Sequence, residues 1–497
     1  MKKYNRISRV LCALCVLLML ATMLPLGVSA AAVYPLAQYK DNFKTQGRVA
    51  WVGDTLMLDW TVAGIEFTAD CSGDVYMTVD AQSITDTTSV GGVYFTVVVD
   101  GVAQPREWCY VNAKGTKKFY VAKGLSAGTH TFGIYRQTEH DAGSVGIQSI
   151  EFAGSGTLKA APAEKDVYIE FIGDSITAAY GNLGNASTNG AHVGKPLYQD
   201  ATQGYAYLAA KELDADFSVV AWSGIGCKYG YGSFSMQEVY PLQRYRYDKK
   251  TQYDFTAREP DVVVLALGTN DNSKAPSTTA KREGLVEMLD MVRAKNPNAK
   301  ILWICNMMTG DVNKMIEEIV EEKGGYKKGY FVATTPRNNA GVGWHPDVKG
   351  QKDFAATVVK AIREQVLNPN YNGPTTTTTT TFDWGSMNPV TTTNTTRGDN
   401  AGDTTTVVDN ADTTTALQQG DVTTQAGEDT PTTTVQNDDA TSTTKKTKKT
   451  AGDDTSTTAS TSPIMWVAIG LAGLAVAAVV VVIVLFATDK KQPKNKQ

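Results

Sequence analysis

Residues 167–175 read Val-Tyr-Ile-Glu-Phe-Ile-Gly-Asp-Ser, an apolar run that ends in turn-forming residues. A run of this length, rich in β-branched and aromatic residues and closed by Gly-Asp, predicts a buried strand at 167–172. Similar runs follow at 217–221, 261–267, 300–305 and 330–332, and helical periodicity is present at 204–213, 279–295, 312–322 and 348–367. Strands that alternate with helices predict a parallel sheet between two helical layers, so residues 166–370 are expected to form an α/β/α domain.

The preceding region, residues 33–160, has a different pattern. Seven short runs are alternating or β-branched, at 55–60, 64–68, 75–79, 93–99, 117–121, 129–135 and 145–152. Turn signals such as Asp100-Gly101 and Lys123-Gly124 separate them. This spacing predicts an antiparallel β-sandwich of the jelly-roll kind.

The N-terminus carries a targeting signal. Residues 1–30 begin with basic side chains, continue with an apolar run at 10–26, and end in Val28-Ser29-Ala30. Small residues at that position suit a signal peptidase, so we expect a cleaved signal peptide. A retained N-terminal anchor is the less favoured alternative, because the apolar run is short for a membrane span.

The C-terminal sequence predicts a linker followed by a membrane anchor. Residues 374–462 are rich in threonine, dotted with aspartate and poor in apolar side chains, which predicts a disordered linker. Residues 464–487 are uncharged and apolar and long enough to cross a bilayer as one helix, and the lysine-rich tail 488–497 is expected to be cytoplasmic. We therefore expect secretion, with the folded head held outside the cell and anchored in the plasma membrane.

Composition excludes some classes of protein. The 497 residues are 42% hydrophobic and carry a formal net charge of −4, without the basic patch that a nucleic-acid partner requires. Beyond the signal peptide, the cysteines are Cys71, Cys109, Cys227 and Cys305. None of them forms a C-x-x-C pair, so the sequence shows no cysteine motif for metal binding. Buried thiols are favoured over disulfides for cysteines so widely spaced.

Polar residues follow two of the predicted parallel strands. Ser175 comes directly after the first strand, and Gly268-Thr269-Asn270-Asp271 follows another. Because the carboxyl ends of parallel strands share one edge of a sheet, we expect Ser175, as a nucleophile, and Asn270, as a donor to an oxyanion, to lie close together. The structural alternatives are that Asp174-Ser175 caps the next helix and that the second motif is a plain turn.

A third strand is followed by Ser223-Gly224-Ile225-Gly226, where Gly224 or Gly226 could offer a backbone N–H to the same oxyanion. A general base is also needed, and the chain has four histidines. Two lie in the β-rich region and His192 lies in a polar loop, so elimination favours His345, just before the last helix.

Taken together, Gly173-Asp174-Ser175, the glycine after the second strand, Gly268-Thr269-Asn270-Asp271 and His345-Pro346 resemble the SGNH (GDSL) hydrolase superfamily. The resemblance implies that Ser175 is the nucleophile and also gives a backbone N–H, that Gly226 or Gly224 and Asn270 complete the oxyanion hole, and that His345 is the base. Supporting positions are Asp174, Gly268 and Asp271, and Trp344 is a candidate substrate platform. Neither a metal nor a cofactor is expected.

The β-rich region, with Gln46-Gly47-Arg48-Val49 near its start and Val99-Asp100-Gly101 inside it, makes the pair of domains resemble carbohydrate esterase family 2. That resemblance implies removal of acetyl groups from plant cell-wall polysaccharides such as xylan or glucomannan. The alternatives are a lipase or thioesterase of the same superfamily, and a surface carbohydrate-binding or adhesion protein without turnover.

One departure concerns the base. The superfamily usually places Asp three residues before the histidine, and sometimes two, but these positions are Val342 and Gly343. The sequence therefore predicts a Ser–His dyad, with the second ring nitrogen of His345 held by a backbone carbonyl or by a distant acid.

Overall fold

The computed structural model describes residues 31–305, 308, 310, 312–373, 375–383, 388–396 and 405–409. The predicted signal peptide, membrane helix and cytoplasmic tail lie outside these residues. Within the described part of the chain, no helix is both long and apolar enough to cross a bilayer.

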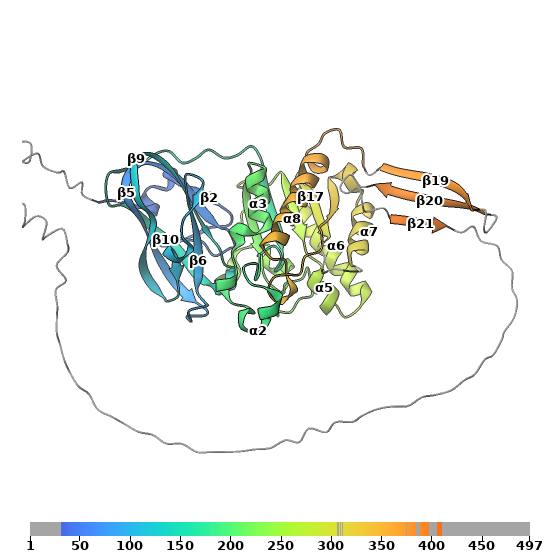
Figure 1. Ribbon diagram of the computed structural model, residues 1–497, viewed down its shortest axis with the longest axis horizontal. Helices are drawn as coiled ribbons and strands as arrows, with labels where there is room; N and C mark the ends of the chain where they lie inside the picture. The colour runs from blue at the N-terminus through green and yellow to red at the C-terminus, as the bar shows by residue number, and fades with distance from the viewer. Residues whose placement is uncertain are drawn as a thin grey trace, which may run out of the picture. The chain divides into compact units, whose positions relative to one another are not determined.

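The N-terminal β-domain is entirely antiparallel in its strand pairing (Figure 1). Its strands are β1 (Ala32–Pro35), β2 (Lys44–Gln46), β3 (Ala50–Val52), β4 (Thr55–Met57), β5 (Gly64–Ile84), β6 (Val93–Val99), β7 (Val102–Ala103), β8 (Tyr110–Val111), β9 (Gly115–Arg136), β10 (Gly143–Phe152) and β11 (Gly156–Leu158). Alternate residues along β5 are buried, as the period-two pattern predicted.

The predicted strand lengths were wrong in this domain. Two predicted runs, 64–68 and 75–79, merge in β5, and two others, 117–121 and 129–135, merge in β9. Register shifts between Cys71 and Tyr76 interrupt the pairing of β5 with β9. Such bulges bend a strand without ending it. Within the described residues, the long strands therefore join all eleven strands of this domain into one connected sheet.

The second domain has the predicted α/β/α layers. Its five-stranded parallel sheet has the order β13-β12-β16-β17-β18. The strands are β12 (Tyr168–Gly173), β13 (Asp216–Ala221), β16 (Val262–Ala266), β17 (Lys300–Cys305) and β18 (Tyr330–Thr334), and the main helices are α3 (Tyr205–Glu212), α6 (Thr278–Lys295), α7 (Val312–Glu322) and α8 (Val348–Ala361). The last predicted helix, 348–367, ends in a π-helical turn, Ile362–Val366.

The two faces of this sheet bury different helices. Ile169 and Phe171 of β12 belong to the same core cluster as residues of α3 and α8, whereas Ile172 belongs to the cluster that contains residues of α6 and α7. Figure 1 shows the same arrangement, with α3 and α8 on one side of β17 and α6 and α7 on the other. Both faces are buried, which explains why the strands are continuous apolar runs.

Shorter elements complete the two domains. They are α2 (Asn189–His192), α4 (Met236–Val239), α5 (Thr269–Lys274), β14 (Leu242–Arg244), β15 (Asp248–Gln252), η1 (Leu36–Gln38), η2 (Lys40–Asn42), η3 (Arg106–Trp108), η4 (His140–Ala142), η5 (Ala186–Thr188), η6 (Pro196–Tyr198), η7 (Ala201–Gln203), η8 (Gly325–Lys328) and η9 (Val342–Trp344).

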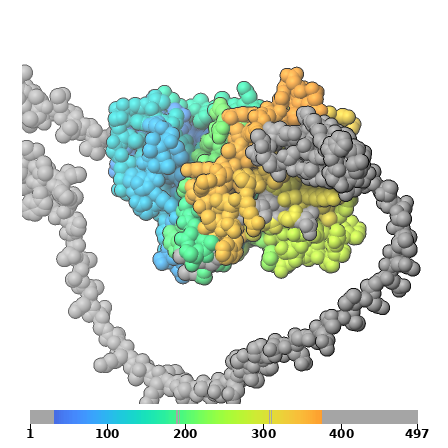
Figure 2. Space-filling view, turned by 45° about the vertical axis from the view of Figure 1, so that its right-hand side comes forward, coloured from blue at the N-terminus to red at the C-terminus, as the bar shows by residue number. Residues whose placement is uncertain are grey.

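The β-domain contacts the α/β domain directly (Figure 2). The Arg48 guanidinium is fully buried and donates to the Glu170 carboxylate of β12 at 3.0 Å. The neighbouring Gly47, at φ +73°, donates its N–H to the Phe217 carbonyl at 2.9 Å. The Gln46-Gly47-Arg48 motif is thus an interdomain contact, in which a buried charge is paired as burial requires.

Part of the threonine-rich segment differs from the prediction of disorder. Three strands, β19 (Thr375–Asp383), β20 (Asn388–Thr396) and β21 (Thr405–Asp409), pair antiparallel. Threonine is β-branched and favours extended backbone, which accounts for strands in a segment that has no apolar periodicity. The remainder of the predicted linker lies outside the described residues.

Within the described part of the chain, Cys71, Cys109, Cys227 and Cys305 are buried and form no disulfide. They are small hydrophobic core residues, which was the favoured alternative.

Candidate active site

Two residues that are 170 positions apart meet at the carboxyl edge of the parallel sheet. The Ser175 hydroxyl lies 2.7 Å from Nε2 of His345. Ser175 follows the end of β12 by two residues, and His345 lies between β18 and α8. The serine after the first predicted strand and the histidine before the last predicted helix are therefore within hydrogen-bond distance of each other.

In the turn after β12, the side chains of Asp174 and Ser175 have different partners. The Asp174 carboxylate accepts the Ile176 N–H at 3.0 Å, so Asp174 stabilises the turn. Ser175 instead directs its hydroxyl at His345. Burial raises the pKa of Asp174 to about 7, because the protein interior disfavours the charged form of a carboxyl group.

The partner of the second ring nitrogen of His345 is now identified. Nδ1 lies 3.1 Å from the Val342 carbonyl and 3.0 Å from the Gly343 carbonyl. Carbonyl oxygens only accept, so Nδ1 must carry the proton and Nε2 must present its lone pair to the Ser175 hydroxyl. This tautomer is the one that a general base needs, and no carboxylate is required to select it.

The geometry also shows why the other described histidines are not the base. His130 pairs with Asp100 in the β-domain at 2.6 Å. His140 is fully buried and stacks on Trp60, and His192 stacks on Tyr198. Among the described histidines, His345 is the one whose ring contacts the Ser175 hydroxyl, and its role as the base stays a prediction.

The pKa of His345 lies below its ordinary value. Burial is the largest cause, and the two carbonyl contacts act in the opposite direction. No neighbouring carboxylate appears among the causes. The neutral, basic form of the imidazole is therefore maintained to lower pH than that of a free histidine.

We expect the pH profile of turnover to follow this shift. Because the base must be unprotonated, kcat/KM should rise with pH, reach its plateau by neutrality, and be half lost at a pH below about 6.5, the unperturbed histidine value. The measurement is kcat/KM for an acetyl ester between pH 4.5 and 8.5. An apparent pKa above 7 would indicate that a carboxylate raises the basicity of His345.

The loop that follows β13 is fixed by Asp271. Its carboxylate accepts the backbone N–H groups of Cys227, Lys228 and Tyr229 at 2.7, 3.0 and 2.9 Å. Burial raises the pKa of Asp271, and these three N–H donors lower it. Asp271 therefore supports the site by ordering the loop that carries Gly224 and Gly226, and it does not face Ser175 as a reactant.

Asn270 lies on the same edge of the sheet. Its Nδ2 donates to the Ile225 carbonyl at 2.7 Å and contacts the Asp174 carboxylate at 3.5 Å, the outer limit of a hydrogen bond. Gly268 precedes α5 at φ +122°, which only glycine adopts without strain, and so turns the chain between β16 and Asn270. Asn270 is thus held beside the loop after β13, and its role as an oxyanion donor stays a prediction.

Both candidate glycines have a steric reason to be glycine. A Cβ on Gly226 would lie 1.9 Å from the Tyr229 carbonyl oxygen, and Gly224 has φ +79°. The role of either N–H as an oxyanion donor stays a prediction.

The rim of the site carries aromatic side chains. Trp344 is 59% exposed and has φ +63°, an uncommon conformation for a bulky residue. Such strain is often found at functional sites, and the platform role of Trp344 stays a prediction. Tyr180, which the sequence analysis missed, places its ring 4.8 Å from the ring of His345.

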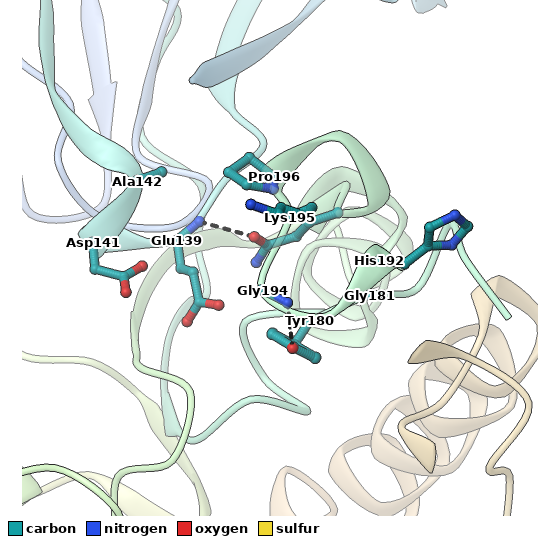
Figure 3. Close-up of a pocket in the computed structure, with 10 residues that line it drawn as sticks. Glu139, Asp141, Ala142, Tyr180, Gly181, His192, Gly194, Lys195 and Pro196 are labelled. Carbon is teal, nitrogen blue, oxygen red and sulfur yellow. Dashed lines mark hydrogen bonds between the residues drawn. The ribbon is translucent and has the colours of Figure 1, made fainter. Parts of the chain in front are cut away.

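Glu139 of the β-domain was also missed. It lines a pocket together with Asp141, Tyr180 and Lys195, so the β-domain contributes directly to the surroundings of the site (Figure 3). No local pattern marks Glu139 in the sequence, because its relevance depends on how the domains pack. Within the described part of the chain, no group of three or more His, Cys, Asp or Glu side chains is placed to bind a metal.

A parallel sheet between helical layers, with a Ser–His pair at its carboxyl edge, a glycine after its second strand and an Asn after a neighbouring strand, is typical of serine hydrolases of the SGNH type. Comparison with known families agrees. The GDSL-like Lipase/Acylhydrolase family model matches residues 171–366, and the Carbohydrate esterase 2 N-terminal model matches residues 45–162. Residues 171–366 are thus similar to GDSL-like hydrolases, and the two domains together are similar to family 2 carbohydrate esterases.

Relatives with curated names are esterases. Cellulase/esterase CelE of Acetivibrio thermocellus is 31% identical over 292 residues, which are 56% of this chain but only 35% of CelE. An acetylxylan esterase / glucomannan deacetylase of Cellvibrio japonicus is 26% identical over 289 residues, 54% of this chain and 78% of that protein. A solved family two carbohydrate esterase from Clostridium thermocellum, in complex with cellohexaose, is 26% identical with a TM-score of 0.57, covering 65% of this chain and 98% of that one.

Proposed function

We propose that this protein is a carboxylic ester hydrolase that removes O-acetyl groups from plant cell-wall polysaccharides through an acyl-enzyme on Ser175. The observation that carries the proposal is the 2.7 Å contact between the Ser175 hydroxyl and Nε2 of His345, whose other nitrogen is held by two carbonyls. A hydroxyl becomes a competent nucleophile when such a base can remove its proton.

The chemistry uses this chain's own residues. Ser175 attacks the acetyl carbonyl while His345 takes its proton, and Asn270 with the loop glycines stabilises the developing oxyanion. His345 then returns the proton to the leaving sugar oxygen, which frees the sugar hydroxyl and leaves acetyl-Ser175. Water, deprotonated by His345, attacks the acetyl-enzyme, releases acetate and regenerates the Ser175 hydroxyl.

Two lines support a glycan substrate. Two curated relatives from Cellvibrio japonicus are named as acetylxylan esterases / glucomannan deacetylases, and a solved relative is in complex with cellohexaose. Trp344 presents a largely exposed aromatic ring next to His345 in sequence, and aromatic faces bury area at low entropic cost when they bind ligands. These features favour a sugar leaving group over a lipid.

The test is acetate release by the purified full-length protein from a panel of acetylated glycans, including xylan and glucomannan, beside a chromogenic series of acetyl to octanoyl esters. We expect acetate from at least one glycan and preference for the acetyl ester. Preference for octanoyl esters with no glycan deacetylation would indicate a lipase. Retention of glycans without turnover of any ester would indicate a binding protein.

We further propose that the enzyme acts at the cell surface, anchored by residues 464–487 with both folded domains outside. This rests on the sequence of the two ends of the chain, which lie outside the described residues. A surface position gives the domains access to polymers too large to enter the cell.

Protease added to intact cells should release an active fragment by cleavage between residues 410 and 462, because low-complexity polar segments are preferred cleavage sites. Activity in the supernatant and the mass of the fragment are the measurements. Lysed cells serve as the control. Full protection of the fragment in intact cells, with cleavage only after lysis, would contradict the topology.

A further inference from the structure

A buried carboxylate of the β-domain reaches the active-site edge of the other domain. Glu139 lies just beyond β9 and is only 7% exposed. Its two oxygens contact the backbone N–H and the hydroxyl of Ser223, each at 2.8 Å. Ser223 is 84 residues away in the sequence and follows β13 by two residues.

Ser223 begins the loop that carries Gly224 and Gly226. Asp271 holds the far end of this loop through three N–H groups, and Glu139 holds its start through two bonds. A backbone N–H can move only with its peptide plane, so contacts at both ends of a short loop determine where its N–H groups point. The two carboxylates come from different domains, and only Asp271 belongs to the α/β domain.

We propose that Glu139 is a positioning residue that sets the oxyanion-stabilising loop, so that the β-domain completes the active site of the hydrolase domain. The inference rests on the proposed esterase activity. It assigns a catalytic reason for the association of the two domains, beyond the contact through Arg48.

Glu139 is itself rigidly held, as a positioning residue must be. Its carbonyl accepts from the Arg136 guanidinium at 2.6 Å, and its N–H donates to the side chain of Gln199 at 3.3 Å. The Gln199 amide in turn donates to the Ala178 carbonyl at 2.7 Å, three residues beyond Ser175. Glu139 therefore bridges the turn that carries the nucleophile and the loop after β13.

The protonation state of Glu139 suits this role. Burial, followed by the charge of Asp141, raises its pKa to about 8. When protonated, the carboxyl can donate to the Ser223 hydroxyl while its other oxygen accepts the Ser223 N–H, so both contacts persist. A glutamine side chain offers the same donor and acceptor.

The experiment measures kcat and KM for a chromogenic acetyl ester with the full-length protein and its variants. Glu139→Ala should lower kcat about 10- to 100-fold with KM changed less than about threefold, because misplaced donors weaken transition-state binding. Glu139→Gln should restore kcat to within about threefold of wild type. Ser223→Ala, which removes one of the two contacts, should lower kcat about three- to tenfold.

Inhibition by methylboronic acid gives a second readout, since its tetrahedral adduct with Ser175 places an oxygen in the oxyanion hole. Its affinity should fall in parallel with kcat in Glu139→Ala. The matched control is Lys211→Ala, which removes the interdomain ion pair with Glu66 at 2.8 Å and touches no site residue named above. This control should lower the unfolding temperature without changing kcat.

Unchanged kcat in both Glu139→Ala and Ser223→Ala, with an active wild type, would overturn the inference alone. So would a Glu139→Gln variant as impaired as Glu139→Ala. If Glu139→Ala does not fold, Ser223→Ala and the boronate affinity of that variant decide the matter. An inactive wild type would instead refute the proposed function.

Discussion

Replacing Ser175 with alanine is expected to reduce turnover of an acetyl ester by about 10⁶-fold, the loss that follows removal of a serine nucleophile from a comparable site. The reason is that the attacking oxygen itself is removed, and no other described hydroxyl contacts Nε2 of His345. The fold should survive, because only one small polar contact is lost, at a cost of about 1 kcal/mol. Acetate release and urea unfolding of the two proteins are the measurements.

Ser187→Ala is a suitable control, because Ser187 is an exposed serine of the same domain whose hydroxyl donates to the Asn185 side chain. It should retain full activity. A Ser175→Ala variant that keeps near-normal activity would exclude Ser175 as the nucleophile and with it the acyl-enzyme mechanism.

The second large effect concerns His345. His345→Ala should lower kcat about 10⁴- to 10⁶-fold, because the Ser175 hydroxyl then has no base in contact with it. His130→Ala, which removes a histidine paired with Asp100 in the β-domain, is the matched control and should leave kcat unchanged. Equal losses in the two variants would point to a stability effect and contradict the base assignment.

A related comparison tests the dyad itself. Asp347 lies two residues after His345, but its carboxylate accepts the Gly350 N–H at 2.8 Å and caps α8. Asp347→Asn should therefore change kcat only slightly, since asparagine is an equally good N-cap. Loss of a true triad carboxylate costs about 10⁴-fold. Any Asp or Glu whose amide substitution produces such a loss in a folded protein would replace the two carbonyls as the group that orients His345.

Much of the α/β domain was predictable because its signals are local. A buried parallel strand reads as an apolar run, and a helix reads as a 3.6-residue period, so β17 and α7 were placed at their observed bounds. The β-domain was harder. Bulges near Cys71 allow β5 to continue through residues that read as a turn, so two predicted strands became one.

The same contrast holds for the site. Sequence alone placed Ser175 and Asn270 at one edge, because the carboxyl ends of parallel strands must share that edge, and elimination among the histidines favoured His345. It could not choose between a backbone carbonyl and a distant acid for Nδ1 of His345. That choice depends on the turn at 341–345, where Gly343 at φ +62° lets two carbonyls face the ring.

The sequence by itself thus determined the chemical groups, the positions along the chain of the strands that present them and the pair of domains, since these follow from residue type and periodicity. Only the tertiary structure decided that His345 is oriented by carbonyls and that Glu139 of the β-domain holds the loop at Ser223. The physical reason is that a hydrogen bond between residues 84 positions apart, such as Glu139 to Ser223, is fixed by the packing of two domains. Packing depends on the shape of the whole buried interface, and no local stretch of sequence encodes that shape.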